Sequence, residues 1–91
     1  MERTMNAKIK YSFLGLDNNK DMVIQLGFDC ELGTVSSQQL VVVDAFFLKE
    51  ILETLELTRW EDLPRKFARI KVQDKRVVAV GNLIEERWVK L

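Results

Sequence analysis

The chain contains no histidine, and it has one cysteine, Cys30, and one proline, Pro64. The lack of histidine removes the commonest general base and the commonest metal ligand, and it makes a Ser-His-Asp triad impossible. One cysteine cannot form an internal disulfide or a thiolate metal site. The four glycines are scattered and form no phosphate-binding loop. The sequence therefore predicts no catalytic residues, no metal site, no cofactor and no enzymatic activity.

Long hydrophobic runs are also missing. Residues 40–43 are apolar, but a membrane helix needs roughly 18 such residues, so we expect no contact with a membrane. The N-terminus lacks the apolar segment of a secretory signal, and with the single cysteine this favours the cytoplasm. The length suits a single domain, residues 1–91. Met5 could be a second start site, in which case residues 1–4 form a disordered leader.

Charge is balanced overall but divided along the chain. The 14 basic residues match the 14 acidic residues, for a formal net charge of zero. Residues 1–57 hold five basic and nine acidic side chains, whereas residues 58–91 hold nine basic and five acidic. Such a molecule could present one basic face to an anion, although a plainly solvated surface explains the same pattern.

Period-two alternation marks the strands. Ala7, Ile9, Tyr11 and Phe13 alternate with polar residues and predict one apolar strand face. Residues 15–20 suit a turn, and the alternation at residues 22–28 predicts an antiparallel partner. Residues 40–43 read as the end of a weaker third strand. Residues 67–73 and 77–80 predict two further strands, joined by a turn at residues 74–75.

One amphipathic helix is predicted at residues 45–57, with Asp44 as its N-cap. Its apolar face carries Phe47, Leu48, Ile51, Leu52 and Leu55. The predicted fold is therefore α+β, a small antiparallel sheet with the element order β-β-β-α-β-β and the helix packed on it. We expect the helix face to share one core with the strands and with residues 60–63.

The basic strand at residues 67–73 is the strongest indication of a site. An aromatic side chain can stack on a base while the neighbouring cations neutralise phosphate. The Asn82 amide could read a base edge. Alternatively, Phe67 covers the helix end and Arg69 pairs with Glu61 or Asp62. The predicted binding residues are Arg65, Lys66, Phe67, Arg69, Lys71, Arg76 and Asn82.

Self-association is the second expectation. Phe46 lies off the apolar helix face, either as an exposed contact residue or folded back onto the preceding strand. The strand at residues 77–80 is apolar on both faces, and a domain this small gains from a partner subunit. We expect a homodimer or larger homo-oligomer, with Phe46, Val77 and Trp88 at the interface.

The chain resembles small proteins encoded in bacteriophage and prophage genomes, through a Trp-Glu-Asp-Leu-Pro turn, an Arg-Ile strand and a Val-Gly-Asn strand. The matching positions are residues 6–10, Leu14-Gly15, Trp60 to Pro64, Arg69-Ile70, Val80 to Asn82 and Trp88. Two departures are Arg65, where the relatives have glycine, and residues 36–39, which replace a segment rich in glycine and aromatic residues.

This resemblance implies a phage accessory protein that acts in the cytoplasm of a bacterial host. The expected function is non-catalytic inhibition of a bacterial defence system, as anti-CRISPR proteins do. The expected partner is a host defence protein, a ribonucleoprotein effector, or a nucleotide signal molecule. The alternative is a small nucleic-acid-binding module in phage replication or regulation.

Overall fold

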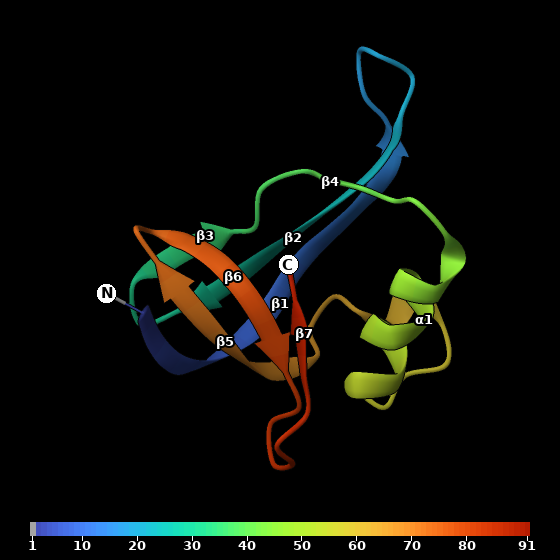
Figure 1. Cartoon of the computed structure of the whole chain (residues 1–91). Helices are drawn as coiled ribbons and strands as arrows, with labels where there is room; N and C mark the ends of the chain where they lie inside the picture. Colours follow the sequence, from blue (N-terminus) through green and yellow to red (C-terminus); the bar gives the residue numbers. More distant parts are fainter. Residues whose placement is uncertain (1) are drawn as a thin grey trace.

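The computed structural model describes residues 2–91, which fold into a small β-barrel with one α-helix beside it (Figure 1). Seven strands and two helical segments follow one another along the chain. They are β1 (Glu2–Leu16), β2 (Met22–Cys30), β3 (Gly33–Ser36), β4 (Leu40–Val41), α1 (Ala45–Thr54), the 3-10 turn η1 (Trp60–Asp62), β5 (Phe67–Gln73), β6 (Arg76–Gly81) and β7 (Trp88–Lys90).

The barrel closes because β1 is long enough to pair with two strands. Its first half pairs with β5, from Glu2 to Lys8, and its second half pairs with β2, from Lys8 to Leu16. Strand β5 continues to β6, and β2 continues to β3. A parallel contact between Ser36 of β3 and Arg76 of β6 completes the ring. The expected open sheet with a helix packed on it is therefore wrong, since five strands form a closed barrel.

The order of the five barrel strands is β1-β2-β3-β6-β5 and back to β1, with α1 between β3 and β5 along the chain. Four of these five contacts are antiparallel, and the fifth, the β3–β6 seam, is parallel and one residue pair long. Strand β7 pairs with the rest of the β6 edge, and β4 extends β2. This is the strand order of the OB-fold, a five-stranded Greek-key barrel.

The N-terminal residues belong to the barrel. Glu2, Arg3 and Thr4, which the sequence suggested as part of a leader, lie in β1 and pair in register with β5. The first residue of that expected leader, Met1, lies outside the described residues.

Helix α1 starts as expected and ends earlier than expected. The Asp44 carboxylate accepts a hydrogen bond from the Phe46 backbone N–H at 3.0 Å, which confirms the N-cap. The helix ends at Thr54 rather than at residue 57. Glu56 adopts a left-handed backbone conformation with φ 59°, and the Leu57 N–H reaches back to the Leu52 carbonyl at 2.8 Å. These contacts form a Schellman motif, which stops the helix.

The expected core is confirmed. Ile9, Ile24, Leu26, Ile70 and Val80 from the barrel strands are fully or almost fully buried, and they form one cluster with Ile51, Leu55 and Leu63. Leu48, Leu52 and Trp60 are partly buried and pack against this cluster. The helix and the 60–63 turn therefore cover one part of the barrel core.

Candidate functional site

The predicted binding residues divide into two groups. Arg65, Lys66, Phe67 and Asn82 border one cavity of about 300 Å³, together with Leu55, Glu56, Leu83 and Ile84. Arg69 and Lys71 follow on β5, beside Trp88. Arg76 lies apart at the barrel seam, where its guanidinium approaches the Gln38 side chain at 3.5 Å.

The cavity combines two cations and one carboxylate, that of Glu56, with apolar surface. It lies between the end of α1, the start of β5 and the loop after β6. Arg65, one of its lining residues, has a left-handed backbone conformation with φ 77°. Phe67 is 57% exposed and Ile84 is 86% exposed, so its rim offers aromatic and aliphatic surface to solvent. Such a cavity suits a ligand that has a flat apolar part and a negative charge.

Asn82 connects the end of α1 to the loop after β6, and both segments border this cavity. It is only 7% exposed. Its amide donates hydrogen bonds to the Thr54 carbonyl and the Glu56 carboxylate, both at 3.0 Å. Its carbonyl oxygen accepts hydrogen bonds from the N–H groups of Ile84 at 2.9 Å and Glu85 at 3.0 Å. All of its side-chain hydrogen-bonding groups are thus used within the protein.

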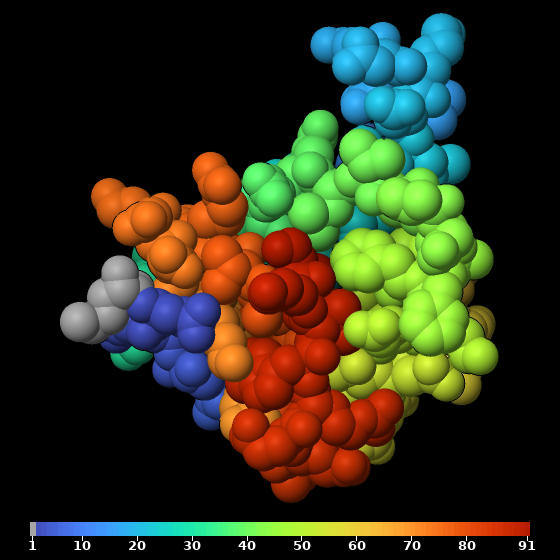
Figure 2. Space-filling view, viewed as in Figure 1, coloured from blue at the N-terminus to red at the C-terminus, as the bar shows by residue number. Residues whose placement is uncertain are grey.

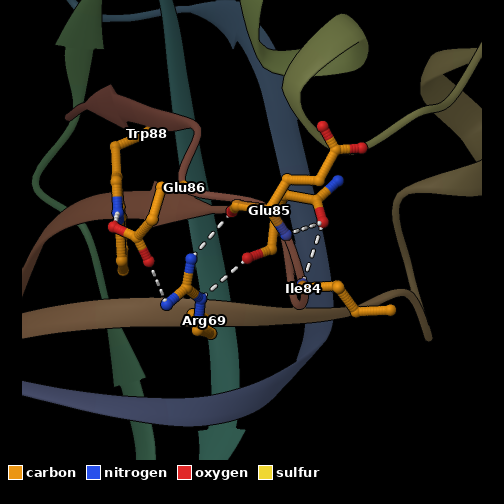
Figure 3. A network of polar contacts seen from close by, with 6 residues as sticks. Arg69, Ile84, Glu85, Glu86 and Trp88 are labelled. Carbon is orange, nitrogen blue, oxygen red and sulfur yellow. Dashed lines mark hydrogen bonds and ion pairs between the residues drawn. The ribbon is translucent and has the colours of Figure 1, made fainter.

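Arg69 is likewise engaged by the loop after β6 (Figure 3). Its guanidinium donates to the carbonyls of Asn82 and Glu85, both at 2.8 Å, and forms an ion pair with Glu86 at 2.7 Å. It therefore pairs with neither Glu61 nor Asp62. The guanidinium anchors the loop instead of projecting free from β5.

The Glu86 carboxyl group has a pKa below its ordinary value of 4.5, chiefly because Arg69 donates a hydrogen bond to it. The Trp88 indole N–H adds a second donor at 3.2 Å. Because this carboxyl pKa is lowered in the folded protein, the ion pair contributes to folding stability at pH values above the ordinary pKa. Its contribution is lost as the pH falls through the lowered value.

Substituting Arg69→Gln should raise the pKa of Glu86 toward 4.5, because the main donor to its carboxylate is removed. NMR titration of the Glu86 side-chain carboxyl measures this shift. The matched control is Arg59→Gln, which removes the partner of Asp62 at 3.2 Å and should raise the pKa of Asp62 while leaving Glu86 unchanged. An unchanged Glu86 midpoint in Arg69→Gln would show that the ion pair does not form.

The three expected interface residues lie in different environments. Phe46 is 67% exposed, so of the two alternatives the side chain takes the exposed one. Val77 is 1% exposed and belongs to the core, which leaves it no surface for a second subunit. The half-buried Trp88 packs on Gly81, with Arg69 at 4.9 Å and Lys71 at 4.4 Å over its ring.

A β-bulge creates an aromatic surface that the sequence pattern did not predict. The register of β1 on β2 shifts between Ile9 and Tyr11, so Lys10 is an extra residue. Such a bulge exchanges the two strand faces beyond it. Ala7 and Ile9 point into the core as expected, but Tyr11 and Phe13 are 37% and 42% exposed. Their expected place on the apolar strand face is therefore wrong.

Both of these rings are supported from below by glycine backbone. A Cβ atom on Gly27 would lie 2.0 Å from the Tyr11 ring, and one on Gly15 would lie 2.9 Å from the Phe13 ring. Each ring thus covers a glycine with one side. Gly27 lies in the interior of β2, where a glycine is a sequence signal for the close approach of another group.

Cations accompany these aromatic side chains. Lys8 pairs directly with Phe67 across β1 and β5, and its ammonium lies 5.6 Å from the centre of the Phe67 ring. Lys10 is exposed and reaches Thr34 on β3 at 3.5 Å. We call Phe67, Lys8, Lys10, Tyr11 and Phe13 the aromatic stripe. It extends across the outside of the barrel from the cavity to the β1–β2 hairpin.

Residues 2–91 contain no group of three or more side chains that could hold a metal ion. The same residues include no helix with the length and apolar character needed to cross a membrane. Comparison with known proteins finds no matching family model, curated protein or solved structure. The resemblance to the OB-fold thus rests on strand order alone. The function of the site follows from the side chains that form it.

Proposed function

We propose that the protein is a non-catalytic binding protein whose aromatic stripe and adjoining cavity bind a short single-stranded nucleic acid. The observation that carries this proposal is the pair of rings, Tyr11 and Phe13, each resting on a glycine with its exposed surface toward solvent. A supported aromatic ring loses little freedom when a base stacks on it, and stacking tolerates any base.

The cations supply the second half of the interaction. Lys8 and Lys10 lie between the aromatic side chains, and Arg65 and Lys66 lie at the cavity next to Phe67. Alternating rings and cations match the alternating bases and phosphates of a single strand. OB-type barrels bind oligonucleotides chiefly on the face of their second and third strands, so the fold supports this class of ligand by analogy, whereas the stripe itself lies on β1 and β5. Because the formal net charge is zero, the attraction for phosphate comes from these local cations and not from the charge of the whole protein.

A fluorescein-labelled oligothymidylate of about ten nucleotides tests this proposal. Fluorescence anisotropy should show binding that weakens steeply with added salt, because phosphate contacts release counterions. Tyr11→Ala should weaken binding about tenfold or more, and Tyr11→Phe should retain most of it. Gly27→Ala should also weaken binding, because the new Cβ displaces the Tyr11 ring without removing it.

Phe46→Ala is the matched control, since Phe46 is an exposed aromatic residue at the start of α1 and does not belong to the stripe. This variant should bind like the unmodified protein. Equal affinities of Tyr11→Ala and Phe46→Ala would contradict the proposal, as would a lack of binding at low salt.

Inhibition of a bacterial defence system, through an effector complex or a nucleotide signal, stays a prediction from the resemblance to phage proteins. The cavity beside Phe67 supports the nucleotide version, because it combines a ring with two cations. Protein purified from bacteria and then denatured should release a compound with the ultraviolet spectrum of a nucleobase. Release of no such compound would count against a nucleotide signal.

A further inference from the structure

The second half of β1 has a free backbone edge. On the neighbouring strand β2, the Leu26 carbonyl accepts a hydrogen bond from Ser37, and the Met22 carbonyl accepts one from Val42. Both carbonyls therefore point away from β1. Because antiparallel pairs alternate between bonded and non-bonded, their partners on β1 also direct their backbone groups away from β2. The residues with outward N–H and C=O groups are Ser12, Leu14 and Leu16.

Strand β5 does not cover this edge. Its pairing with β1 ends at Lys8, and the next contacts are the backbone bonds of Ile9 with Arg65 and Lys66. Within residues 2–91, no further backbone hydrogen bond reaches the outer edge of β1 beyond Ile9. The hairpin of β1 and β2 projects from the body of the protein at this point (Figures 1 and 2).

The exposed hairpin also lacks the usual protection of a strand edge. Residues 11–16 include no charged residue and no proline, which are the common means of blocking edge pairing. Leu14 is 42% exposed, Leu16 is 60% exposed and Met22 is 44% exposed, all on one face of the hairpin. A free edge with apolar side chains is a surface that favours addition of another strand.

We propose that this edge pairs with the same edge of a second copy, to form a two-fold antiparallel β1–β1 dimer. Closed two-fold pairs are the commonest homo-oligomers. The formal net charge of zero imposes no repulsion between the two copies. The partner is thus a second copy of this chain, and its interface differs from the expected one at Phe46, Val77 and Trp88.

One register satisfies every free group. If Leu14 lies opposite Leu14 of the second copy, Ser12 lies opposite Leu16, and all three residues use both backbone groups across the interface. The same register places Phe13 opposite Gly15, which has no side chain to obstruct the ring. Shifting the strands by two residues leaves one pair of outward groups unused. A two-fold axis perpendicular to the sheet keeps Tyr11 of both copies on the same face.

Positional cross-linking tests this register. Directly opposed bonded residues have Cα atoms about 5.5 Å apart, which suits a disulfide. In a Cys30→Ser background, Leu14→Cys should form a covalent dimer under mild oxidation. The matched Leu16→Cys should not, because its opposite residue is Ser12. Mixing Ser12→Cys with Leu16→Cys should restore cross-linking. Equal cross-linking of Leu14→Cys and Leu16→Cys would overturn the register.

Sedimentation equilibrium tests the dimer itself. The mass should rise from the 10.6 kDa monomer to twice that value with concentration. Leu14→Pro removes an outward N–H without breaking the β1–β2 ladder and should remain monomeric, with circular dichroism verifying its fold. Phe46→Ala should dimerise normally. A monomer at all concentrations, or dissociation by Phe46→Ala but not by Leu14→Pro, would overturn the proposal. Oligonucleotide binding is measured separately, so the two proposals fail independently.

Discussion

Replacing Asn82 by alanine should lower the free energy of unfolding by about 2–4 kcal/mol. The side chain is buried and makes four hydrogen bonds that connect the end of α1 to the loop after β6. Alanine leaves the Thr54 carbonyl and the backbone N–H groups of Ile84 and Glu85 without these partners. The hydrogen bond to the Thr54 carbonyl is buried and those from Ile84 and Glu85 are partly buried, so the loss of these partners is costly, whereas a solvated amide loses little.

Urea denaturation followed by circular dichroism measures the effect of Asn82→Ala. The control is Asn6→Ala, because Asn6 is an exposed asparagine on the outer face of β1. This control should change the free energy of unfolding by no more than about 0.5 kcal/mol. Asn82→Asp should also destabilise the protein, since it sets a second carboxylate beside Glu56. Equal stability of Asn82→Ala and Asn6→Ala would refute the structural role of Asn82.

Truncating Leu63 to alanine should cost about 2–5 kcal/mol of stability. Leu63 follows the 3-10 turn η1, and it is fully buried in the cluster that joins the barrel to α1. Alanine would leave a cavity in this cluster that the surrounding strands cannot readily fill.

The matched control is Leu83→Ala, which makes the same change at a leucine that is 41% exposed. Thermal unfolding should show a clearly lower midpoint for Leu63→Ala and only a small change for Leu83→Ala. Similar midpoints for the two variants would mean that Leu63 does not belong to the core.

Local patterns in the sequence predicted the local elements well. The alternation at residues 22–28 and 67–73 corresponds to β2 and β5, and the residues chosen for the core are buried or partly buried in one cluster. The N-cap at Asp44 is correct because capping depends on the next two or three residues alone. The turn at Asp74 and Lys75 is also correct, and both residues have positive φ.

Barrel closure could not be predicted in this way, because it depends on pairing between distant segments. Ala7 pairs with Ala68, and Ser36 pairs with Arg76, and neither contact leaves a periodic signal in the sequence. The bulge at Lys10 is a second feature that the sequence pattern could not predict. Regular alternation continues through residues 7–13, so the pattern gives no sign that Tyr11 and Phe13 change sides.

The candidate site shows the same division. Arg65, Lys66, Phe67 and Asn82 are close in sequence or near the ends of paired strands, and they do meet at one cavity. Composition alone could not show that Arg69 is occupied by the loop after β6, because its partners include backbone carbonyls. Tyr11 and Phe13 were missed because their position depends on a register shift.

The double pairing of β1 also determines when the protein can fold during its synthesis. The first hairpin, β1 with β2, is complete in the first 30 residues and can form early. The other half of β1 has no partner until β5 leaves the ribosome, at translation rates of about 5–20 residues per second. For those seconds the apolar side chains of Met5, Ala7 and Ile9 remain uncovered. A nascent chain stalled before Phe67 should therefore be a ready substrate for holdase chaperones, which bind unfolded chains.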